Sequence, residues 1–460
     1  MIATWNSSRS WVLRNAFLKA GDLIWRQGMM RRLSFLERAQ WWRREDIEVW
    51  RNGQLQTLID TAFHEVPFYR SLFDRCRVKV GEIKSSFDIR RLPIVTKAML
   101  SAQYPQQTTR NTGLKTYEVS SSGSTGNNFW VTEDAETAGH YRAAFMLALE
   151  WAGWQLGEPH MQMGMTLARS WDRQLKDWLL CCHYVSAYEL DDKSLDAALD
   201  ALERTHIRHL WGYPGSLYFL AKRALQKGWN RPLKTLVTWG DNLFRHYRST
   251  IENAFGTRVY DTYGCAEGFQ IAAQCGVSSN YHLHSADVIV EFLDDHGEPV
   301  PDGRLGNIVV TRLHPGPMPL IRYRTGDVGI SGGQDHCPCG RGFELLASVQ
   351  GRDTDVVVTP SGNRLIVHFF TGLIESFHEI GCFQVLQHEI GSMVVRIVPS
   401  KPNAVDDSVK GRLVSTLRQH GATDIDIVVE TADHIPTAPS GKRRFVISKV
   451  APQSSAYLQS

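Results

Sequence analysis

A chain of 460 residues has room for two or three domains and can bury a substantial core without disulfide staples. Its composition, 43% hydrophobic and 22% charged with a net charge of +3, excludes wholesale disorder, which requires low hydrophobicity and high net charge. No uncharged apolar run approaches the roughly 20 residues of a membrane-spanning helix. We expect no secretory signal and, despite eight cysteines, no disulfide framework, so a reduced cytoplasmic setting is predicted.

The first 44 residues carry the positive charge of the chain. They hold nine Lys or Arg residues and two acidic ones, which leaves a net charge of −4 for the remainder. Tryptophan and phenylalanine side chains are interspersed among these charges. Such a segment either packs on its own domain as a helical arm or lies on an anionic membrane surface at the inner face of the membrane. Nucleic-acid binding is disfavoured, because the basic excess is confined to one arm and no recognition motif accompanies it.

The elements expected up to residue 264 form a helical region followed by alternating strands and helices. Leu55, Leu58 and Ala62 recur at helical spacing within a helical region that covers residues 1–75, and Pro67 breaks the pattern. The alternation over 205–264 indicates βαβ units and a largely parallel sheet. Further predicted elements are a strand, polar loop and strand over 117–131 and helices over 134–150 and 194–204.

The pattern changes near residues 350–355, where we place a domain boundary. Strands dominate 282–330, whereas the chain after 350 alternates strands and helices in a compact α+β unit. The predicted fold is therefore α/β: a large domain with mixed or parallel sheets and helices, followed by a small mobile α+β domain. The predicted limits are 1–50 for a basic helical arm packed on the large domain, 51–350 for the large domain and 351–460 for the small one.

The strongest local signal is the run Ser120-Ser121-Ser122-Gly123-Ser124-Thr125-Gly126. Glycines let the backbone approach a ligand closely, and successive N–H groups and hydroxyls form a concavity that binds anions such as phosphate. It is not a Walker loop, because no Gly-Lys-Ser/Thr follows. A run of this composition is also typical of a linker. Its position between two strand-like segments argues against that alternative.

Four further polar stretches follow at long intervals. Each alone is an ordinary turn, but together and in this order they are hard to attribute to chance. They are Asp261-Thr262-Tyr263-Gly264-Cys265-Ala266-Glu267-Gly268, Tyr323-Arg324-Thr325-Gly326-Asp327, Gly351-Arg352-Asp353-Thr354-Asp355 and Pro436-Thr437-Ala438-Pro439-Ser440-Gly441-Lys442-Arg443-Arg444.

With these five motifs the sequence resembles the adenylate-forming superfamily of acyl-CoA synthetases, adenylation domains and luciferases, from about residue 50 to 448. Its likeness is greatest to phenylacetate–CoA ligases and CapK-like proteins of polysaccharide gene clusters. The segments that carry the subgroup likeness are Val66-Pro67-Phe68-Tyr69-Arg70, Leu92-Pro93-Ile94-Val95-Thr96-Lys97 and Phe383-Gln384-Val385-Leu386-Gln387.

The resemblance implies that a carboxylate reacts with ATP to give an acyl-adenylate and pyrophosphate. The loop from Ser121 to Gly126, with Thr125, would cradle phosphates, and Glu267 would hold Mg²⁺. Lys442 would contact the oxygens on which negative charge builds. The remaining nucleotide contacts are assigned to Gly240, Asp241, Tyr263, Gly264, Asp327 and Arg352, and the walls of the acyl pocket to Tyr213, Trp239, Gly240 and Tyr263. Trp239 is as readily interpreted as a core residue.

The acceptor of the acyl group is less well defined. Phenylacetate ligases usually carry an Asp as the fourth residue of the Gly-Arg motif, where this chain has Thr354, and their Gly-Asn-Val-x-Pro segment is absent. Transfer to CoA is the first hypothesis. Transfer to an amine or hydroxyl in polysaccharide or natural-product biosynthesis is the alternative. A degenerate nucleotide-binding scaffold is a third hypothesis, against which Glu267, Asp327 and Lys442 argue. A homodimer is left open.

A zinc site is suggested by the close pair Cys337-Pro338-Cys339. Upstream lie Cys275 and His282, with His284 and His336 as alternative ligands. Some relatives in the resembled subgroup carry a structural zinc on one Cys, one His and a Cys-x-Cys pair, and Cys₃His is a standard tetrahedral set. The alternative is a pair of buried thiols beside surface histidines.

Overall fold

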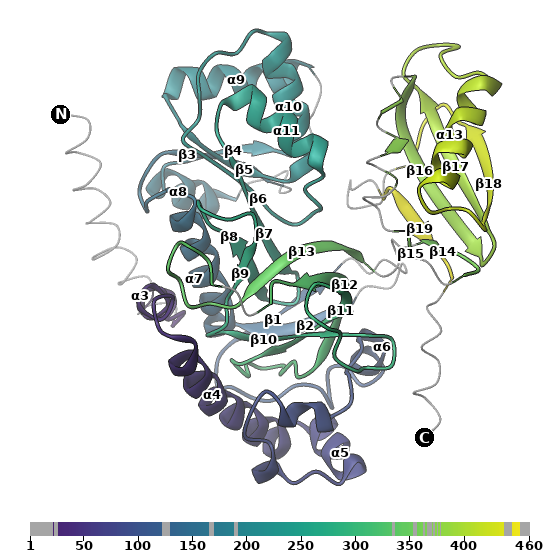
Figure 1. Cartoon of the computed structure of the whole chain (residues 1–460). Coiled ribbons are helices and arrows are strands. Elements are labelled where there is room, and N and C mark those ends of the chain that lie inside the picture. Colours follow the sequence, from purple (N-terminus) through teal and green to yellow (C-terminus); the bar gives the residue numbers. More distant parts are fainter. Residues whose placement is uncertain are drawn as a thin grey trace. The chain divides into compact units, whose positions relative to one another are not determined.

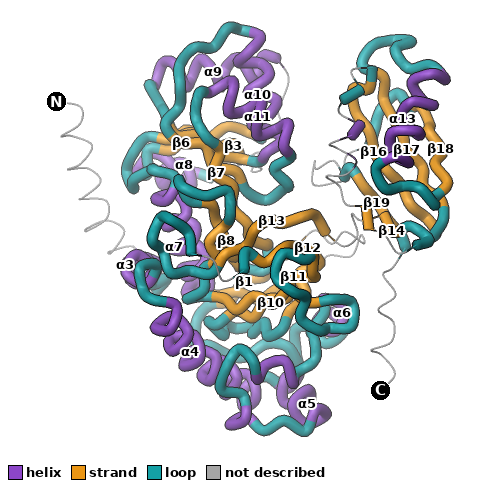
Figure 2. The backbone as a smooth tube through the Cα atoms, viewed as in Figure 1, coloured by secondary structure: helices purple, strands orange, loops and turns teal. Residues whose placement is uncertain are grey.

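The structure is a computed structural model of the chain, shown in Figures 1 and 2. The residues that it describes are 22, 26–121, 129–164, 170–187, 192–333, 336–352, 357–361, 364–365, 370, 373–374, 376–377, 379–436 and 444–450. None of the helices formed by these residues is both long and apolar enough to cross a bilayer.

The chain divides into two compact units. The first unit comprises residues 1–291, 309–325 and 331–348, and the second comprises 292–308, 326–330 and 349–460. The domain limits inferred from the sequence, including the arm over 1–50, stay a prediction.

Three helices follow one another at the start of the described chain: α3 (Met29–Ala39), α4 (Arg44–Glu65) and α5 (Pro67–Cys76). Pro67 begins α5, because a proline in the first turn needs no N–H partner, and the extended Val66 separates α5 from α4. Leu55, Leu58 and Ala62 are buried on one face of α4, as their helical spacing predicts. Helix α3 packs against α7 (Ala135–Trp151).

A β-hairpin precedes α7. Strands β1 (Thr116–Ser121) and β2 (Phe129–Asp134) are antiparallel, and the pair Ser121↔Phe129 holds the two ends of the intervening segment side by side. Asp134 caps α7, because its Oδ1 accepts hydrogen bonds from the Thr137 N–H and hydroxyl at 2.8 Å each. The strand, polar loop and strand predicted over 117–131 have their two strands here.

Five parallel strands, in the order β4-β3-β5-β6-β7, alternate along the chain with helices. Strands β5 and β6 are buried at every position, as expected for strands covered on both faces. The βαβ alternation predicted from the sequence is therefore confirmed. The elements are β3 (His160–Gly164), α8 (Trp171–Leu179), β4 (Cys182–Ser186), α9 (Asp192–Thr205), β5 (His209–Gly212), α10 (Pro214–Gln226), β6 (Thr235–Thr238), α11 (Arg245–Phe255) and β7 (Val259–Cys265).

The sheet continues beyond β7 with antiparallel pairing. Strand β7 pairs with β8, β8 with β9 and β9 with β13, and the full order is β10-β11-β12-β13-β9-β8-β7-β6-β5-β3-β4. The added strands are β8 (Phe269–Gln274), β9 (Tyr281–Leu283), β10 (Val288–Leu293), β11 (Leu305–Arg312), β12 (Tyr323–Ser331) and β13 (Leu345–Arg352). Three short helices precede the β1–β2 hairpin: η2 (Val80–Glu82), η3 (Asp88–Arg91) and α6 (Lys97–Ser101).

The C-terminal part of the chain forms a four-stranded sheet in the order β18-β17-β16-β19. Alternate residues of β17 are buried, including Met393, Val395 and Ile397, so one face of this sheet builds a core. The elements are β14 (Val357–Val358), β15 (Arg364–Leu365), β16 (Ile380–Glu389), β17 (Ser392–Pro399), α13 (Asp407–Gln419), β18 (Asp426–Thr431) and β19 (Val446–Ser448).

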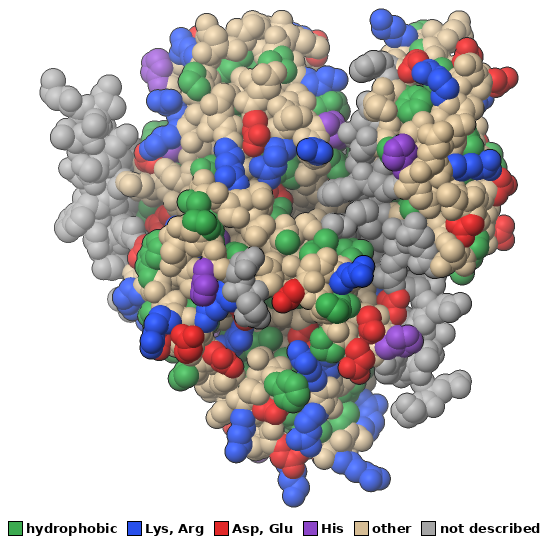
Figure 3. All heavy atoms as spheres, viewed as in Figure 1, with side chains coloured by type: hydrophobic (Ala, Val, Ile, Leu, Met, Phe, Trp, Pro, Cys, Tyr) green, Lys and Arg blue, Asp and Glu red, His purple; other side chains and the backbone are tan. Residues whose placement is uncertain are grey.

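Basic and acidic side chains are interspersed over the face drawn in Figure 3, in keeping with the nearly neutral net charge of +3. Binding of an anionic ligand therefore depends on local groups rather than on a broad positive field.

Candidate active site

A buried carboxylate at the tip of the β7–β8 hairpin forms the centre of the site. Glu267 lies in the tight turn between the paired residues Cys265 and Phe269. Lys97 Nζ lies 2.8 Å from Glu267 Oε1, and the Tyr323 hydroxyl donates a hydrogen bond of 2.8 Å to the same oxygen. The first residue of α6, the β7–β8 turn and the first residue of β12 thus meet at one carboxylate.

The pKa of Glu267 shows that its partners outweigh its burial. Burial by itself would raise the pKa, because it penalises the charged form. The Lys97 ammonium and the hydrogen bonds from Lys97 and Tyr323 lower the pKa below its ordinary value. Glu267 is therefore a carboxylate at neutral pH, the state needed to bind a hard divalent cation.

Aromatic rings surround this carboxylate. The Tyr323 ring is nearly parallel to Phe129 and to Phe269, with centroids 6.0 and 6.4 Å apart. Lys97 Nζ lies 5.7 Å from the centroid of Phe129, within the range of a cation–π contact. Because Phe129 is the first residue of β2, this end of the β1–β2 hairpin lies close to Glu267.

The predicted phosphate-binding motif itself is only partly described. Ser121 is the last residue of β1, and its side chain lies outside the described part of the structure. The predicted contact residues Ser122, Gly123, Ser124, Thr125 and Gly126 lie outside the described residues.

Arg312 supports the turn that carries Glu267. Its buried guanidinium donates to the backbone carbonyls of Glu267 at 3.2 Å, His314 at 3.2 Å and Met318 at 2.6 Å. Burial lowers the pKa of Arg312, and the Glu133 carboxylate opposes that shift. Three carbonyls from two loops are thereby held by one cation.

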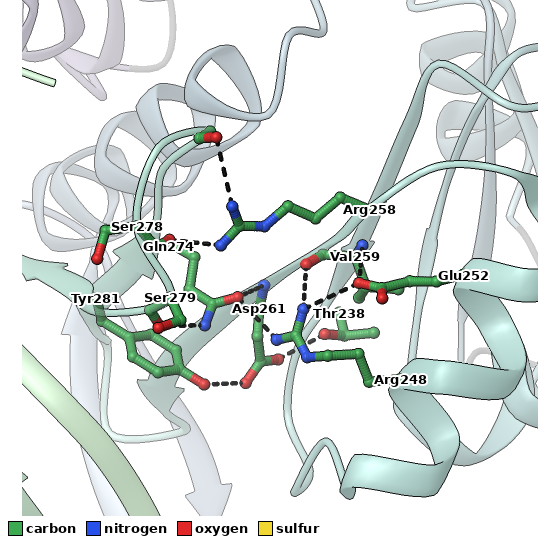
Figure 4. A network of polar contacts seen from close by, with 11 residues as sticks. Thr238, Arg248, Glu252, Arg258, Val259, Asp261, Gln274, Ser278, Ser279 and Tyr281 are labelled. Atoms are coloured by element: carbon green, nitrogen blue, oxygen red, sulfur yellow. Dashed lines mark hydrogen bonds and ion pairs between the residues drawn. The ribbon is translucent and has the colours of Figure 1, made fainter. Parts of the chain in front are cut away.

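A second buried carboxylate, Asp261, is the third residue of β7 and the centre of a polar network (Figure 4). Its Oδ1 accepts from the Thr238 hydroxyl and its Oδ2 from the Tyr281 hydroxyl, both at 2.5 Å. The Asp261 N–H donates to Gln274 Oε1, which also accepts from Arg248. Burial raises the pKa of Asp261 to about 6, against the lowering effect of these hydroxyls. The network joins β6, β7, β8, β9 and α11.

The residues predicted to line the acyl pocket lie partly together. The rings of Tyr213 and Trp239 are 6.1 Å apart in an edge-to-face arrangement. A Cβ added to Gly240 would lie 2.8 Å from Tyr213 Cε1, and its φ is +74°. Trp239 also contacts Phe145 edge-on at 5.5 Å and packs against a core cluster, so its interpretation as a core residue has support. Tyr263 is buried further along β7.

The other predicted contact residues fall at strand ends or in loops. Asp241 is exposed after β6, and Gly264 lies at a β-bulge, where an added Cβ would meet the Phe269 carbonyl at 2.6 Å. Asp327 lies on β12 and Arg352 ends β13, both in the second unit, and the Arg352 side chain is not described. Lys442 lies outside the described residues.

The four predicted zinc ligands converge in the first unit. Their ligand atoms all lie within 4.8 Å of one another. The Cys275 and Cys337 sulfurs are 3.7 Å apart, and Cys339 Sγ is 3.3 Å from His282 Nε2. Two thiolates at about 2.3 Å from a tetrahedral zinc would stand about 3.8 Å apart. The distance between the Cys275 and Cys337 sulfurs is therefore close to the one that zinc requires.

Burial and Arg341 set the pKa values of this cluster. Burial lowers the pKa of His282 to about 4, so its imidazole is neutral and able to ligate. Burial raises the pKa of Cys337 to about 12, whereas hydrogen bonds from Arg341 offset the burial of Cys339 and lower its pKa. His284, the alternative ligand, stacks on Trp151 instead, with ring centroids 5.3 Å apart.

The sequence motifs contain Lys97 and Tyr323, but no role at the site was predicted for either residue. Lys97 belongs to the Leu92–Lys97 segment, and Tyr323 opens the motif that contains Asp327. Their convergence on Glu267 depends on long-range contacts, so no spacing along the sequence indicates it.

The chain is similar in sequence to known proteins. Residues 357–449 match the family described as the CapK C-terminal domain. The chain is 23% identical to a phenylacetate–coenzyme A ligase of Thermus thermophilus over 68% of its own length and 72% of that protein. It is also 23% identical to protein CapK of Staphylococcus aureus, with 58% of each chain covered.

Solved structures show the same fold. A 2-hydroxyisobutyryl-CoA ligase in its postadenylation state superposes with a TM-score of 0.72 at 18% identity, covering 90% of this chain and 91% of the other. An amide bond synthetase of Marinactinospora thermotolerans superposes with a TM-score of 0.50 at 20% identity, covering 69% and 66%.

The fold is therefore that of the class that contains this CoA ligase and this amide bond synthetase. Within that class it is similar to phenylacetate–CoA ligases and to CapK, which confirms the resemblance inferred from the five motifs.

Proposed function

We propose that the protein activates a carboxylate with ATP and transfers the acyl group to CoA. The observation that carries the proposal is the convergence of Lys97 and Tyr323 on buried Glu267, close to Phe129 at the start of β2. A deeply buried carboxylate with a preorganised cation at a phosphate-binding loop is a site for metal-bound nucleotide phosphates.

In the first step a carboxylate oxygen attacks the α-phosphorus of ATP. The bond from that phosphorus to the bridging oxygen breaks, and pyrophosphate leaves with the electron pair. Glu267 would ligate Mg²⁺, which when bound offsets the phosphate charge. Lys97, 2.8 Å from Glu267 in this structure, would exchange its carboxylate partner for phosphate oxygens as they arrive. No side chain needs to act as a nucleophile, because positioning and charge stabilisation suffice.

The remaining nucleotide contacts are proposed from the motifs. Asp327, half-buried on β12, would accept hydrogen bonds from the ribose hydroxyls, with Arg352 assisting. Lys442 would hold the reacting carboxylate and α-phosphate oxygens while negative charge builds. A small domain that carries Lys442 would rotate between the two half-reactions, as motions of this class do in ligases with a hinge.

In the second step the thiolate of CoA attacks the acyl carbon, and AMP leaves. The likeness to CoA ligases favours this acceptor. The alternative acceptor is an amine or hydroxyl in polysaccharide or natural-product biosynthesis. The departures at Thr354 and the likenesses to CapK and to an amide bond synthetase favour that alternative.

We also propose a structural zinc at Cys275, His282, Cys337 and Cys339, which when bound would fix the loop after β8 to the turn before β13. The turn from Cys337 continues into Arg341, whose guanidinium lies 4.9 Å from both Trp41 and Trp151. Arg341 and Trp151 each donate to Gln40 Oε1, at 2.8 and 2.7 Å. A metal there would therefore also order the docking of α3. Two further proposals rest on the sequence alone. The basic segment before α3 would contact the cytoplasmic face of a membrane peripherally, and the protein would form a homodimer.

The test is carboxylate-dependent exchange of labelled pyrophosphate into ATP across a panel of aromatic and aliphatic acids. We expect exchange with at least one acid and a steep loss in Lys442→Ala, with Lys449→Ala as the control in the same segment. Exchange in the absence of any carboxylate would contradict adenylation of an acid. Mass spectrometry of products with and without CoA then decides the acceptor, and a product without CoA would favour the amine or hydroxyl alternative.

A further inference from the structure

A second group of metal-type ligands shares no ligand with the two sites above. Glu136 and His140 are one turn apart on α7, and His314 follows β11. One ligand atom from each lies within 4.8 Å of the other two. The His140 and His314 rings are stacked, with centroids 4.2 Å apart and an interplanar angle of 19°.

The surroundings leave these imidazoles open to a cation. Among the described residues, His314 Nε2 is buried and has no hydrogen-bond partner. His140 Nδ1 lies 3.5 Å from Asp287 Oδ1, and that carboxylate is itself held by Arg32. A carboxylate beside one ring nitrogen orients the imidazole so that the other nitrogen can bind a metal. His140, Asp287 and His314 line a small hollow of about 20 Å³, roughly the space that one water molecule or ion needs.

The chemistry of the group selects its ligand. Two imidazoles and one carboxylate suit Zn²⁺ or a similar transition ion rather than Mg²⁺, which prefers oxygen ligands. Two imidazole nitrogens on one tetrahedral zinc stand about 3.3 Å apart, and the rings would have to rotate out of their stacked arrangement to aim both nitrogens at one ion. We propose that Glu136, His140 and His314 bind a transition-metal ion of the Zn²⁺ class, with one coordination position left open.

The site is coupled to Glu267 through one side chain. Arg312 donates to the His314 carbonyl and to the Glu267 carbonyl, both at 3.2 Å. A metal that fixes His314 against α7 would therefore hold the Arg312 guanidinium and, through it, the turn that carries the catalytic carboxylate. Its ligands are separate from the Cys₃His set, so occupancy of one site does not require the other.

The experiment is a Co²⁺ titration of the metal-stripped full-length protein, followed by visible absorption, with metal content measured after Zn²⁺ loading and desalting. The wild type should bind one ion more than His314→Ala and Glu136→Gln, and its extra band should lack thiolate charge-transfer intensity. His296→Ala, an exposed histidine on the 294–298 turn, should bind like the wild type. Glu136 lies in the first turn of α7 and is not buried, so Glu136→Gln retains the fold even where His314→Ala does not.

Equal metal content in the wild type, His314→Ala and Glu136→Gln would overturn the proposal. The proposal would also be overturned if Cys337→Ser lost the extra ion while His314→Ala and Glu136→Gln retained it. The readout is metal content, so it stands or falls independently of the ligase activity. Unfolding temperature should rise with Zn²⁺ in Cys337→Ser, which keeps this site, and stay unchanged in Cys337→Ser combined with Glu136→Gln.

Discussion

Replacement of Tyr323 by Phe isolates the hydrogen bond to Glu267. The aromatic ring and its parallel contacts with Phe129 and Phe269 are retained, and only the hydroxyl 2.8 Å from Glu267 Oε1 is lost. A hydrogen bond to a charged group contributes about 1.5–3 kcal/mol. Lys97 still compensates the carboxylate, so we expect the lower end, about 1.5 kcal/mol of unfolding free energy.

The loss should depend on pH in a definite direction. The pKa of Glu267 is lowered in the folded protein, so its stabilising contribution is present above the unfolded-state pKa and is lost as pH falls through the folded-state pKa. Tyr323→Phe raises that folded-state pKa. The difference in unfolding free energy between wild type and variant should therefore be full near pH 7 and shrink below about pH 4.5.

Tyr69→Phe is the matched control for urea unfolding and pyrophosphate exchange. Tyr69 is also buried and loses a hydroxyl that donates to the Pro319 carbonyl and accepts from the Ile321 N–H, both at 3.0 Å, without touching Glu267. We expect both variants to lose stability but only Tyr323→Phe to slow exchange, by about tenfold. A pH-independent difference, or equal slowing in Tyr69→Phe, would refute the assigned role of Tyr323.

Three further predictions concern groups around the site. Burial raises the pKa of Asp261 to about 6, so its neutral form stabilises the fold below the unfolded-state pKa, and this contribution is lost as pH rises through about 6. In urea unfolding, the wild type should therefore lose up to ~3 kcal/mol of unfolding free energy relative to Asp261→Asn between about pH 4 and 7. A difference in unfolding free energy that does not change with pH would contradict the raised pKa. Gly268→Ala should destabilise by about 1–3 kcal/mol and slow exchange, because φ is +80° and the added Cβ would lie 2.3 Å from Glu133 Oε1; an unchanged unfolding midpoint would show that the turn adapts. Zinc-loaded Cys337→Ser should contain about one ion fewer than the wild type, with Cys382→Ser, whose thiol lies outside the cluster, as control; equal content in both would exclude the Cys₃His site.

Local sequence patterns predict part of the candidate site, and long-range contacts decide the rest. Glu267 is predicted as a site residue from a local pattern, a carboxylate between glycines after an apolar strand. The strand β7 itself is predicted from the short-range alternation of strands and helices. The Cys337-Pro338-Cys339 pair was likewise visible, although its partners Cys275 and His282 lie more than fifty residues upstream. The contact between Lys97 and Glu267 was not predicted, because these two residues stand 170 positions apart in the sequence.

The sequence by itself determined the periodic elements and the class of chemistry. Spacing of apolar residues predicted α4 and the strands and helices from β5 to β7, because burial of one face is encoded locally. Only the tertiary structure decided that the sheet continues through antiparallel β8, β9 and β13, that Tyr323 reaches Glu267, and that His314 stacks on His140. These contacts depend on which strands become neighbours in the folded chain. The sequence around a side chain does not indicate which distant residue it will contact.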